Sequence, residues 1–297
     1  MPRAYALRIG SLPSGVAAPT AAYTVGTQVG VPTGTSLTTT AGSSLPAHDA
    51  TEVVTLTHPI TGATADLTVR VWRRRRFTGA PSIQPGVGEH FMFDECAFEV
   101  SNSSWALDLN TGGAVANQMA PLYVLRRCTL NGNDTTERVL GGHFVWLQEC
   151  HITGGSDAWQ GGAWSVAERC NIIAGTDTRN PDPHSDGFQM TDTGGLTLHR
   201  CWISAGTTPG QNAALRLGTE FGAVDNFVDV FYCGLDRGGY VVQCDGADNP
   251  GGIGPVRFRG NRWTADAWFY GPTDFVDTTV TEWTNNFTTA GTPVAQP

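Results

Sequence analysis

A short segment of similar sequence recurs along the chain, and this recurrence limits the possible folds more than any other feature does. Each copy runs from an apolar residue through polar residues to a cysteine and a second apolar residue, usually with glycine soon after. Six copies centre on cysteines, and in a seventh, RFRGNRWTAD, asparagine takes the cysteine position: Cys96, Cys128, Cys150, Cys170, Cys201, Cys233 and Asn261. A repeat of about 20 to 30 residues with one short strand motif per copy is typical of a solenoid.

The interval of 20 residues between Cys150 and Cys170 suits one coil of a parallel β-helix, with three short strands and three turns. Longer intervals indicate loops inserted at the turns. Stacked coils lie about 4.8 Å apart, so equivalent residues form ladders. We therefore predict an all-β fold, a single-stranded right-handed parallel β-helix with an N-terminal extended arm or cap. We expect the cysteines to stack inside it as free thiols that pack as small apolar groups. Disulfides between coils are the alternative, within strict torsional limits.

A second strand motif lies upstream of the cysteine segments. Its copies are WALDLNT, TERVLGG, AWQGGAW, GFQMTDT, ALRLGTE and VVQCDGA. Aligning their centres gives a polar column of Asp108, Arg138, Gln160, Gln189, Arg216 and Gln243. The adjacent column is mostly apolar: Leu109, Val139, Gly161, Met190, Leu217 and Cys244. Neighbouring residues of a strand point to opposite sides, so we expect the polar column to face solvent.

Composition and charge divide the chain and exclude several functions. Residues 1–28, rich in Ala, Pro, Gly and Thr, resemble an extended arm suited to attachment, residues 29–80 a β cap or first coils, and residues 81–297 the β-helix with a C-terminal cap. A net charge of -9 argues against nucleic-acid binding. No apolar run is long enough to predict membrane insertion, and the N-terminus lacks the pattern of a secretory signal. No zinc-ligand spacing or phosphate-binding loop occurs, so we expect no metal and no cofactor.

Four segments resemble a family of right-handed parallel β-helix proteins of actinobacteria and their phages. They are VGVPTGTSLT (29–38), HSDGFQMTDTGGLTLHRCWI (184–203), GNRWTADAWFYGP (260–272) and TVTEWTNNFTTAGTPV (279–294). The segment at 51–72, TEVVTLTHPITGATADLTVRVW, departs from the family pattern. The resemblance implies a pectin-lyase-like fold. It does not assign an activity, because such folds include lyases, hydrolases, epimerases and non-catalytic binders.

The most polar segment of the chain, PDPHSDGFQM, contains the candidate catalytic residues Asp182, His184 and Asp186. A carboxylate pair would suit glycoside hydrolysis, and a histidine base would suit lyase or epimerase chemistry. The DPH triplet is similar to a short motif of alginate-type C5-epimerases. The structural alternative is a corner of turn residues, in which Asp186 caps the turn before Gly187.

Candidate glycan contacts lie near the same polar column: Gln189, Arg216, Gln243, Trp159, Trp164 and Glu220. The tryptophans could stack on sugar rings, although aromatic residues of β-helices are more often internal. Four successive arginines, Arg73 to Arg76, form the most basic segment. They predict either a solvated junction between a strand and a turn or a docking site for an acidic neighbouring subunit.

These observations favour a bacteriophage virion protein, a minor tail or tail-tip protein that presents a β-helix to host-surface glycan. We expect it to contact other virion proteins through its N-terminal arm and to form a homo-oligomer, such as a trimer. Location in the virion is the expectation, and an extracellular location is the alternative. Two other functions remain open: a polysaccharide depolymerase or epimerase acting on host cell-wall glycan, and a non-catalytic capsid decoration or scaffold protein.

Overall fold

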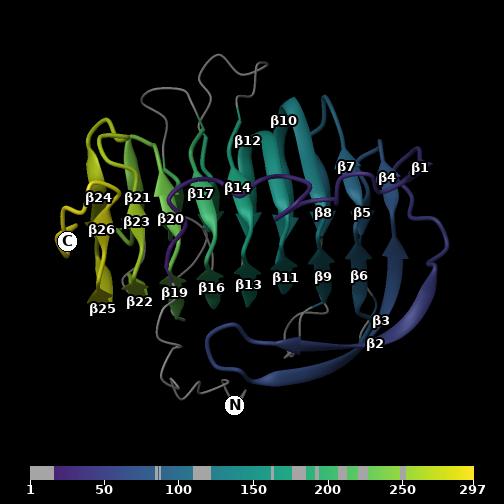
Figure 1. The fold of residues 1–297 in the computed structure, drawn as a ribbon, viewed down its shortest axis with the longest axis horizontal. Coiled ribbons are helices and arrows are strands. Elements are labelled where there is room, and N and C mark those ends of the chain that lie inside the picture. The colour runs from purple at the N-terminus through teal and green to yellow at the C-terminus, as the bar shows by residue number, and fades with distance from the viewer. Residues whose placement is uncertain are drawn as a thin grey trace.

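The chain forms a parallel β-helix in the computed structural model (Figure 1), and the predicted all-β fold class is confirmed. The structure describes residues 17–83, 86, 88–109, 122–161, 164–175, 185–190, 194–206, 213–219, 227–247 and 252–297. Among these residues, no helix is long and apolar enough to cross a membrane.

Each full coil contributes strands to three faces. Face 1 is a 10-stranded sheet in the order β2 (Ala50–Thr57), β3 (Thr64–Arg73), β6 (Phe91–Asp94), β9 (Tyr123–Arg126), β11 (Val145–Gln148), β13 (Ser165–Glu168), β16 (Leu196–His199), β19 (Val228–Phe231), β22 (Ile253–Arg259) and β25 (Thr278–Thr284). All neighbours in face 1 are parallel except β2 and β3, which form an antiparallel hairpin.

Faces 2 and 3 belong to one 16-stranded sheet, because β10 (Thr129–Gly142) and β12 (His151–Gly161) run through both. The other strands of face 2 are β1 (Thr38–Thr40), β4 (Arg75–Phe77), β7 (Ala97–Glu99), β14 (Asn171–Ile173), β17 (Trp202–Ser204), β20 (Gly234–Asp236), β23 (Arg262–Trp263) and β26 (Phe287–Thr288). The other strands of face 3 are β5 (Ser82–Ile83), β8 (Trp105–Leu109), β15 (Phe188–Met190), β18 (Leu215–Gly218), β21 (Tyr240–Asp245) and β24 (Gly271–Val276).

The corner between faces 1 and 2 has the same backbone conformation in every coil. The residue before each ladder position has a positive φ: Arg74, Glu95, Arg127, Glu149, Arg169, Arg200, Tyr232, Gly260 and Asn285. This left-handed conformation turns the chain sharply, and non-glycine residues adopt it only where the surroundings hold them. Ion pairs link part of this column, at 2.9 Å from Arg74 to Glu95 and 3.1 Å from Arg127 to Glu95.

The predicted cysteine ladder is confirmed, and its members are fully buried free thiols. Five of the six thiols donate to a carbonyl of the preceding coil, as Cys128 does to Phe93 at 3.3 Å and Cys233 to Leu198 at 3.5 Å, and Cys170 donates to Glu168 of its own coil at 3.3 Å. Sulfur also accepts, since the N–H of Cys150 points to the sulfur of Cys170 at 3.4 Å. The sharp corner interrupts the regular hydrogen bonding between strands. The ladder side chains bond backbone N–H and carbonyl groups that would otherwise lack a partner.

Asparagine continues the ladder with the same contacts. Asn261 accepts the N–H of Cys233 and donates to the carbonyl of Val230, both at 2.8 Å. Asn286 follows in the next coil and donates to the carbonyl of Phe258 at 3.1 Å. Burial raises the pKa of the Cys128, Cys170 and Cys233 thiols well above the ordinary value.

The β2–β3 hairpin lies outside the coils and covers part of face 1 (Figure 1). Leu56, Leu67 and Val69 of the hairpin pack on a stripe that crosses four coils. That stripe consists of Met92, Val124, Trp146 and Val166. Residues 51–72 therefore do not form a plain coil, because β2 (Ala50–Thr57) and part of β3 form a strap on the surface of the β-helix.

The N-terminal segment, residues 17–37, runs along the outside of face 2, against the direction in which the coils stack, and leads into β1 (Figure 1). Tyr23 and Asn171 bond each other twice, through the N–H of Tyr23 at 2.9 Å and its carbonyl at 2.8 Å. Further along, the N–H of Gly30 reaches the carbonyl of Glu149 at 2.7 Å. Residues 17–28 of the predicted arm thus lie against the chain's own β-helix. Residues 1–16 lie outside the described part.

The predicted polar column and its apolar neighbour are each wrong at one position, because the register of β10 differs from the prediction. Strand register places Asp108, Gly141 and Gln160 side by side, so Arg138 is not in the polar column. Gly142 likewise replaces Val139 in the adjacent column. The corrected polar column is Ser82, Asp108, Gly141, Gln160, Gln189, Arg216, Gln243 and Asp274.

Candidate functional site

Face 3 carries the row of hydrogen-bonding side chains that the sequence predicts. Gln189, Arg216 and Gln243 stand in adjacent strands at one register, with Gln160 before them and Asp274 after them. All five are partly exposed, while Met190 and Leu217 of the adjacent column are fully buried. Neighbouring strands lie about 4.8 Å apart, so the row offers one polar group per coil.

An exposed aromatic cluster lies beside the C-terminal end of this row. Phe269 and Tyr270 are 66% and 65% exposed, and they come directly before β24, which carries Asp274. Their ring centroids are 4.8 Å apart, and Tyr240, at the start of β21, lies 5.5 Å from Tyr270. Their backbone is fixed, since the N–H of Tyr270 bonds the carbonyl of Gly239 at 2.8 Å. We call Tyr240, Phe269 and Tyr270 the aromatic platform.

Two buried aspartates of neighbouring coils lie at the start of face 3, where each accepts a backbone N–H of the following coil. Asp157 accepts the N–H of Asp186 at 3.1 Å, and Asp186 accepts the N–H of Ala213 in the next coil at 2.8 Å. Each carboxylate thus holds the equivalent backbone position of the following coil. This geometry supports the structural interpretation of Asp186, as a brace at a corner.

Arginines approach this carboxylate pair from both sides. Arg138 lies 3.9 Å from Asp157, and Arg216 lies 4.0 Å from Asp186. Burial raises the pKa of Asp157 to about 6, although the Asp186 N–H and Arg138 oppose the shift. Asp157 and Asp186 are only 8% and 1% exposed, so the pair does not open into a groove that a polymer could enter.

The remaining candidate residues differ in exposure, and three of them lie outside the described part of the chain. Trp159 is fully buried against Phe188, with ring centroids 4.8 Å apart, so it offers no surface for a sugar. Trp164 is partly exposed and packs on Phe227 at 6.0 Å. Asp182, His184 and Glu220 lie outside the described residues.

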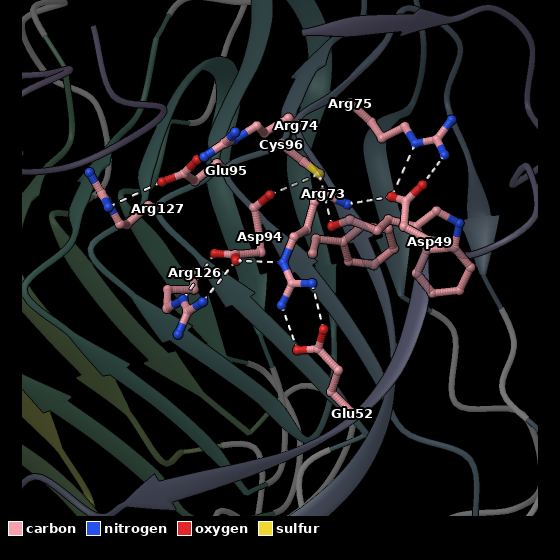
Figure 2. Close-up of polar contacts among 12 residues, drawn as sticks. Asp49, Glu52, Arg73, Arg74, Arg75, Asp94, Glu95, Cys96, Arg126 and Arg127 are labelled. Atoms are coloured by element: carbon pink, nitrogen blue, oxygen red, sulfur yellow. Dashed lines mark hydrogen bonds and ion pairs between the residues drawn. The ribbon is translucent and has the colours of Figure 1, made fainter. Parts of the chain in front are cut away.

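The four successive arginines all have acidic partners within the chain, as Figure 2 shows for the first three. Arg73 bonds both oxygens of Glu52, at 2.6 and 2.5 Å, and lies 3.2 Å from Asp94. The other pairs are Arg74 with Glu95, Arg75 with Asp49, and Arg76 with Glu99. Burial opposes the ionisation of Asp94, but hydrogen bonds from Arg126 and Arg73 outweigh it and lower its pKa. The run therefore fastens the hairpin and the residue directly before it, Asp49, to the first coils.

Sequence reasoning missed the aromatic platform and Asp157. The platform did leave a signal, because three consecutive aromatic residues, Trp268 to Tyr270, cannot all point into the interior of a strand-based fold. Asp157 left none, since nothing in SDAWQGG distinguishes a buried aspartate from a turn residue. No protein-family model matches the chain, and no curated protein or solved structure matches it either.

Proposed function

We propose that this protein is a glycan-recognising parallel β-helix of a bacteriophage virion, a minor tail or tail-tip protein that binds host-surface polysaccharide. The observation that carries the glycan-binding proposal is the exposed aromatic platform at the end of an ordered row of polar side chains on face 3. Aromatic rings with one polar end provide contact area at low entropic cost, and aromatic residues dominate binding energy at many recognition surfaces.

The charge of the row favours a neutral glycan. Its cation, Arg216, lies beside buried Asp186, and Asp274, four residues after Tyr270 in the chain, adds a negative charge to the row. An anionic polymer would meet these carboxylates in a protein of net charge -9. The spacing of one polar group per coil further suggests that the glycan chain runs along the helix axis, with successive sugars on successive coils.

The virion setting rests on the resemblance of four sequence segments to β-helix proteins of actinobacteria and their phages. The same proposal includes attachment to other virion proteins through residues 1–16 and assembly of the chain as a trimer. Sedimentation equilibrium of the purified chain tests the assembly, and a monomer at all concentrations would remove the trimer from it.

Binding to purified actinobacterial cell-wall polysaccharide tests the proposed recognition. Tyr270→Ala and Phe269→Ala should each weaken binding about tenfold or more, the effect of losing roughly 1.4 kcal/mol at a recognition hot spot. Tyr270→Phe keeps the ring and serves as the matched control. Failure of the wild-type protein to bind any such polysaccharide, or equal binding by the alanine variants, would refute the assignment of this site.

One observation favours a second candidate function, polysaccharide cleavage. Burial raises the pKa of Asp157 to about 6, and Asp157 accepts the backbone N–H of a second aspartate, Asp186. Glycosidases use one carboxyl group of raised pKa together with a second carboxylate for acid and base roles. Release of fragments from cell-wall polysaccharide, abolished in Asp157→Asn and in Asp186→Ala, would establish it. The burial of both groups makes recognition without cleavage the better-supported function.

A further inference from the structure

A separate cleft lies on face 1, where the tip of the β2–β3 hairpin meets the coils. Its volume is about 380 Å³, at the small end of the range for ligand sites, about 300–1,000 Å³. The hairpin contributes Thr55 to Pro59 and Gly62, and the coils contribute Trp146, Gln148 and Glu168. This cleft is on a different face from the aromatic platform and the polar row, so an inference about it does not depend on the proposed function.

The hairpin tip that forms one wall is held in place by its own hydrogen bonds. The N–H of His58 bonds the carbonyl of Ala63 at 2.8 Å, and the N–H of Gly62 bonds the carbonyl of His58 at 2.9 Å. The ring of His58 packs edge-on against Trp146, with centroids 6.1 Å apart. A wall fixed before binding lowers the entropic cost of binding a ligand.

The same contacts determine which nitrogen of His58 can donate. Its Nδ1 accepts the N–H groups of Ile60 and Thr61, at 3.3 and 3.4 Å. In a neutral imidazole one nitrogen accepts and the other carries the proton, so Nε2–H is the donor. Burial, aided by the charge of His199, lowers the pKa of His58 to about 4, and the ring is therefore neutral at pH 7.

The opposite wall supplies complementary groups. Glu168 is acceptor-only when ionised, and its Oε1 lies 3.6 Å from Nδ1 of His199. Gln148, beside it in the preceding coil, can donate and accept. Among the described residues, the lining contains no lysine or arginine. The cleft thus combines a neutral donor, a carboxylate, an amide and the edge of an indole.

We propose that this cleft binds a neutral, polyhydroxylated ligand of one or two rings, such as a single sugar unit. Vicinal hydroxyl groups both donate and accept, so they satisfy the carboxylate of Glu168, the amide of Gln148 and the imidazole N–H of His58 together. An anion would find no positive charge there and would lie against Glu168. An amine would satisfy Glu168 but would place its N–H groups against those of His58.

Fluorine NMR of the whole chain labelled with 5-fluorotryptophan tests this proposal. Trp146→Phe assigns the Trp146 resonance among the nine tryptophans of the sequence. The probes are methyl α-glucopyranoside, methyl α-mannopyranoside and methyl β-galactopyranoside, with methylammonium chloride and sodium phosphate for comparison. We expect a saturable shift of the Trp146 resonance with at least one glycoside, at a dissociation constant on the order of 1 mM, the weak affinity expected of so small a ligand.

Gln148→Ala and Glu168→Ala should each weaken this binding about tenfold, as expected when a ligand loses a hydrogen bond to a charged or buried group. Tyr270→Ala, which removes a ring of the aromatic platform, should leave the Trp146 shift unchanged. An unshifted Trp146 resonance with all three glycosides, a stronger response to methylammonium or phosphate, or unchanged binding in both cleft variants would overturn the proposal. A cleft that binds while the platform variants have no effect on polysaccharide binding would refute only the proposed function of face 3.

Discussion

Two substitutions at Asn261 separate the hydrogen-bonding role of the interior ladder from its packing role. The side chain is fully buried, its Oδ1 accepts the N–H of Cys233, and its Nδ2 donates to the carbonyl of Val230. Leucine has a similar shape but no polar atom. Cysteine, in contrast, supplies the donor and acceptor that the ladder uses in the preceding coils.

The expected losses of stability follow from what each substitution leaves unpaired. Asn261→Leu buries the N–H of Cys233 and the carbonyl of Val230 without partners, at about 1–3 kcal/mol each, so we expect a loss of about 2–6 kcal/mol. Asn261→Cys keeps both contacts with weaker sulfur hydrogen bonds, and we expect a loss of at most about 2 kcal/mol. A difference of about 3 kcal/mol between the variants corresponds to roughly 6–12 °C in Tm for a chain of this size.

Urea unfolding, followed by both tryptophan fluorescence and circular dichroism, measures these free energies, provided that the m-value stays constant. Ile203→Leu, in the buried column next to the ladder, is the matched control and should cost less than about 1.5 kcal/mol. Equal losses for the leucine and cysteine variants, or a smaller loss for leucine, would show that packing alone holds the ladder and would refute the hydrogen-bond argument.

Three further predictions concern the flank, the titrating groups and the buried carboxyl pair. Gly234→Val should release the N-terminal segment, because a Cβ at Gly234 would lie 2.3 Å from the ring of Trp202 and 2.6 Å from the carbonyl of Pro19. Proteolysis within residues 17–40 should then become at least about tenfold faster. An unchanged rate would contradict the packing of this segment against Gly234. Burial lowers the pKa values of His58 and His151 to about 4, so below pH 6.5 the unfolded chain binds protons that the folded chain does not. Each histidine should therefore lower the free energy of unfolding as pH falls from 6.5 to 4, by up to about 1.4 kcal/mol per pH unit. In the double variant His58→Gln, His151→Gln, the urea midpoint should depend less on pH over this range. The raised pKa of Asp157 acts in the opposite sense, so Asp157→Asn should stabilise the protein at pH 8 by about 1–3 kcal/mol, and this advantage should shrink below pH 6 and vanish below about pH 4. Destabilisation at pH 8 would mean that the ion pair with Arg138 outweighs burial.

The sequence predicted the interior ladder because its chemistry and its spacing agree. A corner of fixed conformation comes directly before each ladder residue, so few residues can be inserted there without breaking the coil. Cysteine and asparagine share the ability to donate and accept in a small buried space, which explains why Asn261 could be recognised as a member of the series.

The polar column was harder to predict, because an irregularity shifts the register of β10 (Thr129–Gly142). Counting ten residues on from Cys128 reaches Arg138, as counting ten from Cys150 reaches Gln160. Between Asn131 and Thr136, however, β10 has three more residues than β12 has between the partner positions, and Asn133 and Asp134 both have positive φ values. Gly141 therefore stands beside Gln160. The segment NGNDTT contains typical turn residues, but its length within a strand cannot be read from composition.

The hairpin shows a different limit of sequence reasoning. From the sequence we predict only a β cap or first coils for residues 29–80, whereas ATEVVTLT and TADLTVRVW form an antiparallel hairpin joined by HPITGA. Strand alternation does not show which surface the apolar side of such a hairpin will cover, because that depends on tertiary packing. The answer here depends on an outward apolar stripe, including Met92 and Trp146, that strand alternation alone would have assigned to solvent.

The chain's own segments cover parts of faces 1 and 2, and this supports the proposal that glycan binds on face 3. The hairpin occupies the apolar part of face 1, and the N-terminal segment lies on face 2, where it buries Asn171 and Trp202. Within the described residues, neither segment reaches the row formed by Gln189, Arg216 and Gln243. A solenoid must fill its interior columns with apolar or ladder residues, so its freedom to vary lies in outward columns and turns. The outward column that stays polar over successive coils, next to exposed rings, is therefore where recognition can change without loss of the fold.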